Sequence, residues 1–261
     1  MKSVEESVVT AMDGSDIGLF PFLPYIVQDV WEIGSSPEVI IELVRKYTNN
    51  YTSLHILDLG CGKGAVSIRL AGQFHCSCLG IDAVEEFIHT ANKKAREHGV
   101  ARLCKFEIAD IRNKVKELTR FDVIILGSIG PVFGNYYTTL TTLTPCLKRN
   151  GIIIIDDGYI DNNSNYTHPF ILKREDVLQQ IRDSGMEVIA ESIGGKTDIK
   201  DADEYIFARV KKRCLELMEM HPGKRRLFEA YIKKQEEEND VLETKIICSA
   251  MVIKKRETMS Y

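Results

Sequence analysis

The sequence predicts an α/β fold built on a doubly wound, mostly parallel sheet, and three observations support this. From Leu54 onward, short β-branched or apolar runs alternate with amphipathic stretches, which is typical of βαβ units. A glycine-rich loop directly follows the first of these runs, as in the first turn of nucleotide-binding folds. The chain has 261 residues, 44% of them hydrophobic, which is enough for one α/β domain with a modest appendage.

Seven short runs are expected to form the strands, because they are rich in β-branched and apolar residues. They are LHILDL (54–59), CSCLGID (76–82), LCKFEI (103–108), FDVIIL (121–126), GIIIID (151–156), MEVIAES (186–192) and KIICSAMVIKK (245–255).

Amphipathic stretches between these runs predict the helices. In 84–99, apolar residues repeat every four positions and Gly99 is a natural helix stop. Another helix is expected over 173–185, also closed by a glycine. Before the fifth strand, a helix is expected to end at LKRNG (147–151), with basic residues in its last turn. In the N-terminal part, Ser35 or Ser36 can cap a helix that has Pro37 at its first position.

Two segments fall outside the predicted core, which comprises residues 51–196 and 245–261. Residues 1–50 form an irregular and helical cap segment. Residues 197–244 carry two apolar stripes separated by HPGKR, which predicts a helical hairpin inserted between the last two strands. This hairpin is interpreted as a packing or dimer element, or as a lid over a substrate pocket.

Composition restricts the partners. Thirty-four basic and 38 acidic residues give a net charge of -4, which argues against a nucleic-acid partner. The sequence shows no apolar run of transmembrane length and no secretory signal, so we expect a cytoplasmic protein without a membrane segment, as a monomer or homodimer. Seven cysteines without a C-x-x-C pair suggest neither a disulfide framework nor a metal site.

The glycine loop LDLGCGKGA fits two patterns. Gly60, Gly62 and Ala65 satisfy G-x-G-x-x-A, the dinucleotide-binding fingerprint. Read from Asp58, the same stretch is D-x-G-x-G-x-G. In both cases the glycines allow a sharp turn and leave backbone N–H groups bare for a ligand at the start of a helix. The loop therefore indicates a nucleoside ligand without choosing the cofactor.

Three acidic residues discriminate between the two patterns. Asp58 ends the first strand, where it would disfavour a pyrophosphate but could hold an ammonium group. Asp82 ends the second strand, where a carboxylate can accept both ribose hydroxyls. Asp110 follows the third strand, where it can accept a hydrogen bond from the amino group of adenine while the N–H of Ile111 donates one to a ring nitrogen. Together they favour a nucleoside with a cationic tail over NAD.

With these motifs, the chain resembles the class I S-adenosylmethionine (SAM)-dependent methyltransferases over about residues 30–255. The resemblance rests on LDLGCGKG, GIDA, the step from Ala109 to Ile111, FDVIILGS and the K-R-N-G turn into IIIIDDGY. It implies a three-layer fold with seven strands, the last antiparallel, and SAM as cofactor. It further implies cofactor contacts by Asp58, Gly60, Cys61, Gly62, Gly64, Asp82, Ala83, Asp110, Ile111, Gly127 and Ser128.

The acceptor site is less visible in the sequence. The loop after the fourth strand, LGSIGPVFG, lacks the N/D-P-P-Y/F form of enzymes that methylate amino groups of adenine or glutamine. Cys146 after Pro145 is interpreted as a buried structural cysteine. DDGYIDNNSNYTHPF (156–170) offers candidates for catalysis and, with the N-terminal segment, for substrate binding. The catalytic candidates are Asp157, Tyr159 and His168, and the substrate-binding candidates are Tyr25, Trp31 and Tyr166.

The predicted function is methyl transfer from SAM to a small-molecule acceptor. Three alternatives stay open at this point: an RNA or protein methyltransferase, a SAM-binding module that does not catalyse, and an NAD oxidoreductase. The last of these leaves Asp58 and Asp110 without a role.

Overall fold

The computed structural model describes residues 2–257, and within them the strands form one sheet of seven in the order β3-β2-β1-β4-β5-β7-β6. All seven predicted strands are present. Their bounds are β1 His55–Leu59, β2 Ser77–Asp82, β3 Cys104–Ile108, β4 Phe121–Gly127, β5 Leu147–Tyr159, β6 Met186–Ile193 and β7 Ile247–Lys255.

The directions of the strands confirm the predicted fold class. β1 pairs in parallel with β2 and β4, and β4 pairs in parallel with β5. β7 lies between β5 and β6 and is antiparallel to both. The parallel strands therefore all end at one edge of the sheet, which is where ligands bind in open α/β sheets.

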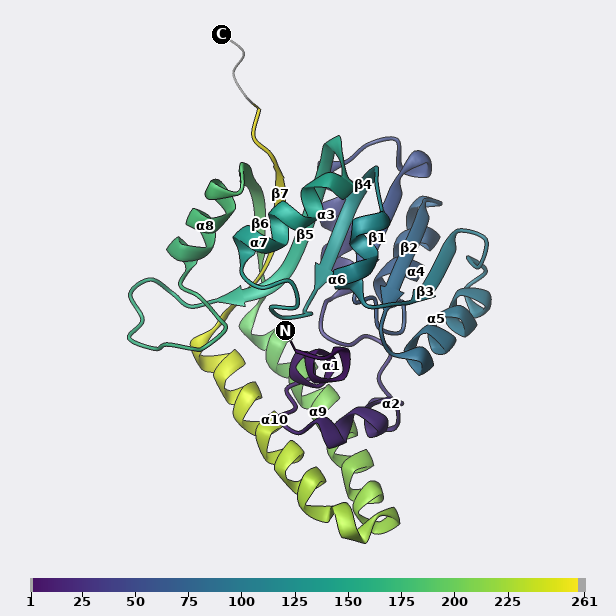
Figure 1. The fold of residues 1–261 in the computed structure, drawn as a ribbon, viewed down its shortest axis with the longest axis vertical. Coiled ribbons are helices and arrows are strands. Elements are labelled where there is room, and N and C mark those ends of the chain that lie inside the picture. Colours follow the sequence, from purple (N-terminus) through teal and green to yellow (C-terminus); the bar gives the residue numbers. More distant parts are fainter. Residues whose placement is uncertain (1, 258–261) are drawn as a thin grey trace.

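Helices cover both faces of the sheet (Figure 1). One face packs against α3, α4 and α5, and the other against α6, α7 and α8. Successive isoleucines of β5 alternate between these two cores: Ile152 and Ile154 belong to the first, Ile153 and Ile155 to the second. The bounds of these helices are α3 Pro37–Tyr47, α4 Ala65–Phe74, α5 Glu85–Glu97, α6 Ile111–Lys114, α7 Tyr136–Leu143 and α8 Arg174–Asp183.

Three short 3-10 helices accompany these elements. The turns after α6 and α7 are the 3-10 helices η3 Val115–Glu117 and η4 Thr144–Cys146, and η2 Tyr51–Ser53 precedes β1. Cys146 is buried, as expected, and its Sγ donates to the carbonyl of Val115 at 3.1 Å. This contact supports the interpretation of Cys146 as a structural residue.

The prediction of a helix ending at LKRNG is wrong. β5 already begins at Leu147, which pairs with Phe121, so residues 147–151 belong to the strand. Helical structure ends one residue earlier, at Cys146. The reason is pairing with β4, because Leu147 already pairs with Phe121 before the register shifts between Phe121 and Val123. Basic residues and Asn-Gly favour a helix end locally, but pairing with β4 extends the strand.

A third apolar core joins the N-terminal segment to the hairpin. Leu19, Leu23 and Ile26 pack with Val210 and Phe228. The N-terminal elements are α1 Val4–Ala11, η1 Ile17–Phe22 and α2 Leu23–Ile26, and the hairpin consists of α9 Lys196–Met220, η5 Pro222–Lys224 and α10 Arg225–Lys245. Figure 1 shows α1 between the lower edge of the sheet and this hairpin. The N-terminal segment thus lies over the edge where the parallel strands end.

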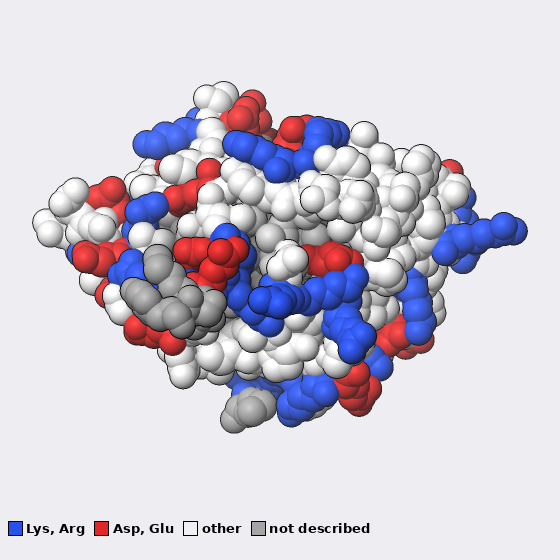
Figure 2. Space-filling model, turned by 90° about the horizontal axis from the view of Figure 1, so that it is seen from above, with Lys and Arg blue, Asp and Glu red and all other residues white. Residues whose placement is uncertain are grey.

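The edge of the sheet where the parallel strands begin is rich in charge. Figure 2 shows Lys and Arg side chains gathered over the middle of this face, with carboxylates between them. One such pair joins Lys148 Nζ to Asp122 Oδ2 at 2.7 Å. Within residues 2–257, every helix is too short or too polar to cross a lipid bilayer.

Candidate functional site

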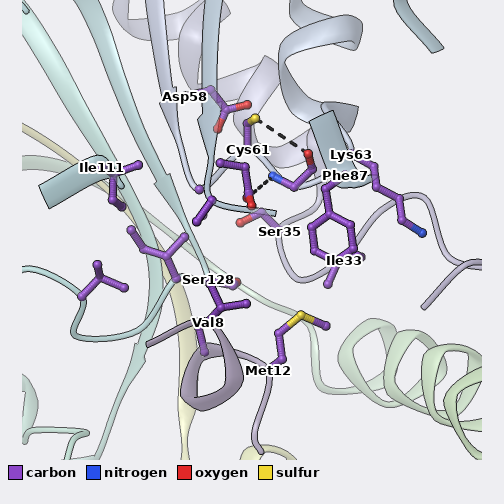
Figure 3. A pocket seen from close by; sticks show the side chains of 18 of the residues that line it. Val8, Met12, Ile33, Ser35, Asp58, Cys61, Lys63, Phe87, Ile111 and Ser128 are labelled. Atoms are coloured by element: carbon purple, nitrogen blue, oxygen red, sulfur yellow. Dashed lines mark hydrogen bonds between the residues drawn. The ribbon is translucent and has the colours of Figure 1, made fainter. Parts of the chain in front are cut away.

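A cavity lies at the edge where β1, β2, β3 and β4 end (Figure 3). The glycine loop after β1 and the residues after β2, β3 and β4 form its wall on the sheet side. α1 and residues 31–35 form the opposite wall. The cavity is therefore built between the predicted core and the N-terminal cap segment.

The glycine loop adopts backbone conformations that favour glycine. Gly60, Gly62 and Gly64 have φ of 71°, 52° and 75°. An added Cβ on Gly60 would lie 2.4 Å from the Ile129 side chain, and one on Gly64 would lie 2.7 Å from Phe106. The first glycine thus brings the loop against the turn after β4, and the last brings α4 against the sheet.

Asp58 is almost completely buried beneath the glycine loop, with 4% of its surface exposed. Its Oδ2 accepts a hydrogen bond of 2.7 Å from the Ser67 hydroxyl on α4. Burial raises the pKa of Asp58 to about 6; the bond from Ser67 opposes the rise and the neighbouring Asp82 carboxylate adds to it. A cationic ligand would stabilise the charged form of this carboxylate.

Asp82 closes β2 and is held by the backbone at both oxygens. Its Oδ2 accepts from the N–H of Gly62 and its Oδ1 from the N–H of Val84, both at 2.9 Å. Burial raises its pKa, while these bonds oppose the rise. Each oxygen keeps a second lone pair, and Asp82 lines the cavity. The carboxylate is thus oriented before any ligand binds.

Asp110 caps α6 and connects the cavity wall to α1. Its Oδ1 accepts from the backbone N–H and the Nε of Arg112, both at 2.9 Å. Burial raises the pKa of Asp110, but the bonds from Arg112 outweigh it and hold the pKa below its ordinary value. Nη1 of Arg112 donates to the carbonyl of Lys2 at 2.8 Å and to the Ser7 hydroxyl at 3.3 Å. Arg112 therefore links Asp110, the acid expected to bind the adenine, to α1.

Ten of the eleven residues predicted to contact the cofactor line this cavity. They are Asp58, Gly60, Cys61, Gly62, Asp82, Ala83, Asp110, Ile111, Gly127 and Ser128. Gly64 instead packs against Phe106 and Ala91. Ser128 has a left-handed φ of 52°, which is uncommon outside glycine and places this residue in a strained turn.

Ser35 is a cavity residue for which the sequence suggested only a capping role. It is 6% exposed, and its Oγ makes no hydrogen bond of ordinary geometry among the described residues. It lies beside the Asp156 carboxylate, where it opposes the rise in pKa that burial causes. Gly127 makes room for it, because an added Cβ there would lie 2.4 Å from Ser35 Oγ. A buried hydroxyl without an ordinary hydrogen bond, at the wall of a cavity, indicates a ligand group.

Lys63 is a second residue that sequence reasoning missed. Its buried ammonium donates to the carbonyls of Val27 and, at 2.6 Å, Val30, just after α2. Its own carbonyl accepts from Trp31 Nε1 at 3.0 Å. Burial lowers the pKa of Lys63 to about 8. The glycine loop thus fixes residues 27–31, and Trp31 lines the cavity as the sequence suggested.

The three catalytic candidates lie outside the described wall of the cavity. In β5, Asp157 is half-buried and Tyr159 is buried, and burial raises the pKa of Asp157 to about 6. His168 Nδ1 accepts from the backbone N–H groups of Phe170 and Ile171. Their catalytic roles stay predictions.

Two of the three substrate candidates also lie apart from that wall. The Tyr25 hydroxyl donates to Glu216 on α9 at 2.9 Å. Tyr166 stacks near His168, with 6.5 Å between ring centroids. Of the three, the structure places only Trp31 at the cavity among the residues it describes.

Comparison with known proteins shows which family the chain belongs to. A family model described as "Methyltransferase domain" matches residues 51–239. The chain belongs to this methyltransferase family. The match spans the glycine loop, all three acids and the turn after β4. Most residues that line the described cavity of this methyltransferase therefore lie within the matched range.

A curated relative supports the assignment, and solved structures support the fold. The chain is 28% identical over 174 residues to a ubiquinone biosynthesis O-methyltransferase of Rickettsia canadensis, covering 58% of this chain and 70% of the relative. A SAM-dependent methyltransferase of Thiobacillus denitrificans, solved with S-adenosyl-L-homocysteine (SAH), has a TM-score of 0.73 at 18% identity and covers 90% of this chain and 98% of its own.

A second solved structure shows that this fold occurs with another named activity. The [4+2]-cyclase SpnF has a TM-score of 0.71 at 15% identity, with 98% of this chain and 97% of that chain covered. At such identities the likeness shows the fold alone, so the activity has to be argued from the site.

Proposed function

We propose that this methyltransferase binds SAM in the described cavity and transfers its methyl group to a small molecule. One observation carries the proposal: the glycine loop and three carboxylates, Asp58, Asp82 and Asp110, surround one cavity that continues past the sheet edge toward α1. The name of the rickettsial relative, an O-methyltransferase of ubiquinone biosynthesis, supports an oxygen atom as acceptor.

The residues of the cavity fit SAM group by group. Asp82 would accept hydrogen bonds from the ribose hydroxyls, because its two oxygens are already oriented by backbone N–H groups. Asp110 and Ile111 would hold the adenine. Asp58 and the Ser35 hydroxyl would hold the methionine tail, where a buried carboxylate matches an ammonium group. NAD would instead bring a pyrophosphate to the buried Asp58.

The chain would align the acceptor with the methyl group of SAM and exclude water from the site. When bound, SAM supplies a methyl group on a positively charged sulfur, which an acceptor atom can displace in line. Ser128 and Gly127 form the wall after β4 where the resemblance places the methyl group. α1 covers this region from the other side, so it would hold the acceptor close to that wall (Figure 3). A general base is needed only if the acceptor must lose a proton.

Titration calorimetry with SAM, SAH and NAD tests the cofactor, and SAM turnover with hydroxylated aromatic acceptors tests the reaction. We expect both adenosyl compounds to bind and NAD not to bind. Binding of NAD without SAH would overturn the proposal. Tight SAH binding without turnover of any acceptor would favour a SAM-binding module that does not catalyse. A cytoplasmic location and a monomeric or homodimeric state stay predictions.

A further inference from the structure

α1 and the residue that follows it carry two apolar faces, and one of these faces lines the cavity. Val9 is 2% exposed and belongs to the core shared with η1 and the hairpin. Val4, Val8, Ala11 and Met12 are only partly buried, and all four line the cavity. A surface helix normally needs one apolar stripe. Val8 and Met12 also pack against that core, so the second face is shared between the core and the cavity.

We propose that this second face binds the methyl acceptor, and that the acceptor is an uncharged molecule with an apolar ring. The inference rests on the proposed function, because it assigns the part of the same cavity that faces the methyl group. It goes further by naming the chemistry of the acceptor and the residues that select it.

The wall opposite α1 is also apolar. Ile129 and Val132, in the loop after β4, line the cavity on the sheet side, and Ile33 adds an apolar side chain on the same side as α1. We call the space between α1 and these three residues the apolar chamber. This loop begins at Ser128, where the cofactor methyl is expected. Ile129 also touches the glycine loop, since an added Cβ on Gly60 would lie 2.4 Å from it. The apolar chamber is thus continuous with the proposed cofactor site (Figure 3).

α1 is held in place at both ends, so the chamber has a defined shape. Arg112 binds the carbonyl of Lys2 and the hydroxyl of Ser7 at its start. At its end, the carbonyl of Met12 accepts from the Tyr231 hydroxyl at 2.9 Å and from Gln235 Nε2 at 3.2 Å. Such a fixed wall can discriminate between acceptors by shape and polarity.

The charged side chains that line the cavity have partners elsewhere. Lys63 extends away from the chamber to two backbone carbonyls (Figure 3), and Arg112 is bound to Asp110 and α1. Asp58 is bound to Ser67, and Asp82 to the backbone. An ionised acceptor would lose its hydration here without gaining a counter-charge from the chain. An uncharged ring would instead gain from leaving water.

Binding to the SAH-loaded protein tests the inference with 1-naphthol and 1-naphthol-4-sulfonate, which share a ring and differ by one charge. We expect 1-naphthol to bind at least about tenfold more tightly than the sulfonate. Equal affinities, or no binding of 1-naphthol, would overturn the inference. Because SAH binding is measured first in the same titration, its absence would count against the proposed function instead.

Paired substitutions locate the effect on α1. In Val8→Thr/Met12→Gln, both side chains keep their approximate size and become polar, and we expect 1-naphthol affinity to fall about fivefold or more with SAH affinity unchanged. Glu5→Gln, on the exposed face of α1, is the control and should change neither affinity. Unchanged naphthol affinity in the double variant would contradict the assignment of this face.

Discussion

The two walls of the cavity differ in chemistry and in origin. The sheet-side wall carries all three carboxylates, placed at or just after strand ends, and is called the polar wall here, although Ile129 and Val132 after β4 also belong to it. The α1 wall is apolar and comes from a helix more than forty residues earlier in the chain. The difference teaches how one cavity can serve two ligands: the polar wall suits a nucleoside with a cationic tail, and the apolar wall suits an uncharged ring.

If the two walls serve separate ligands, a change on the sheet side should affect the cofactor alone. Asp82→Ala removes the carboxylate proposed to bind the ribose, and we expect SAH affinity to fall by about 2 kcal/mol, or about thirtyfold. Thermal unfolding checks that the fold is kept. Unchanged SAH affinity would place the ribose elsewhere.

Ser35 lies where residues 31–35 meet the sheet side of the cavity at Gly127, and it gives a smaller, sharper test. Its Oγ makes no hydrogen bond of ordinary geometry among residues 2–257, so Ser35→Ala should leave the free energy of unfolding unchanged or raise it. If the hydroxyl binds the methionine tail, SAH affinity should fall by about 1 kcal/mol, or about fivefold. Calorimetry and denaturant unfolding of the same variant measure both quantities. A loss of stability with normal SAH affinity would make Ser35 purely structural.

The pH dependence should differ between the free and the SAH-bound protein. Burial raises the pKa of Asp58 and Asp157 to about 6, above the value of an unfolded chain. The folded state therefore takes up protons, and the free protein should gain thermal stability as pH falls from about 7.5 to about 5. Bound SAH needs the charged form of Asp58, so its affinity should weaken over the same range. An affinity independent of pH would separate Asp58 from the ammonium group.

The polar wall could be predicted from the sequence because its signals are local. Each acid ends or directly follows an apolar run, and the glycines stand at fixed spacing after β1. The early start of β5 could not be predicted because the pairing of Leu147 with Phe121 on β4 overrides the local helix-end signal.

The apolar wall could not be predicted because its contacts join distant residues. Lys63 reaches Val30 across 33 positions, and Arg112 reaches Ser7 across 105. α1 itself had one local signal, the capping box formed by Ser3 and Glu6, which could have located the helix. Its role at the cavity follows only from the fold.

A structure of the protein with SAH bound tests the central claim most directly, because it shows which wall each part of the ligand contacts. We predict the ribose on Asp82, the methionine tail near Asp58 and Ser35, and the sulfur facing the chamber between α1 and Ile129. A sulfur atom that faces away from α1, toward the loop that carries His168, would contradict the division of the cavity into a cofactor wall and an acceptor wall.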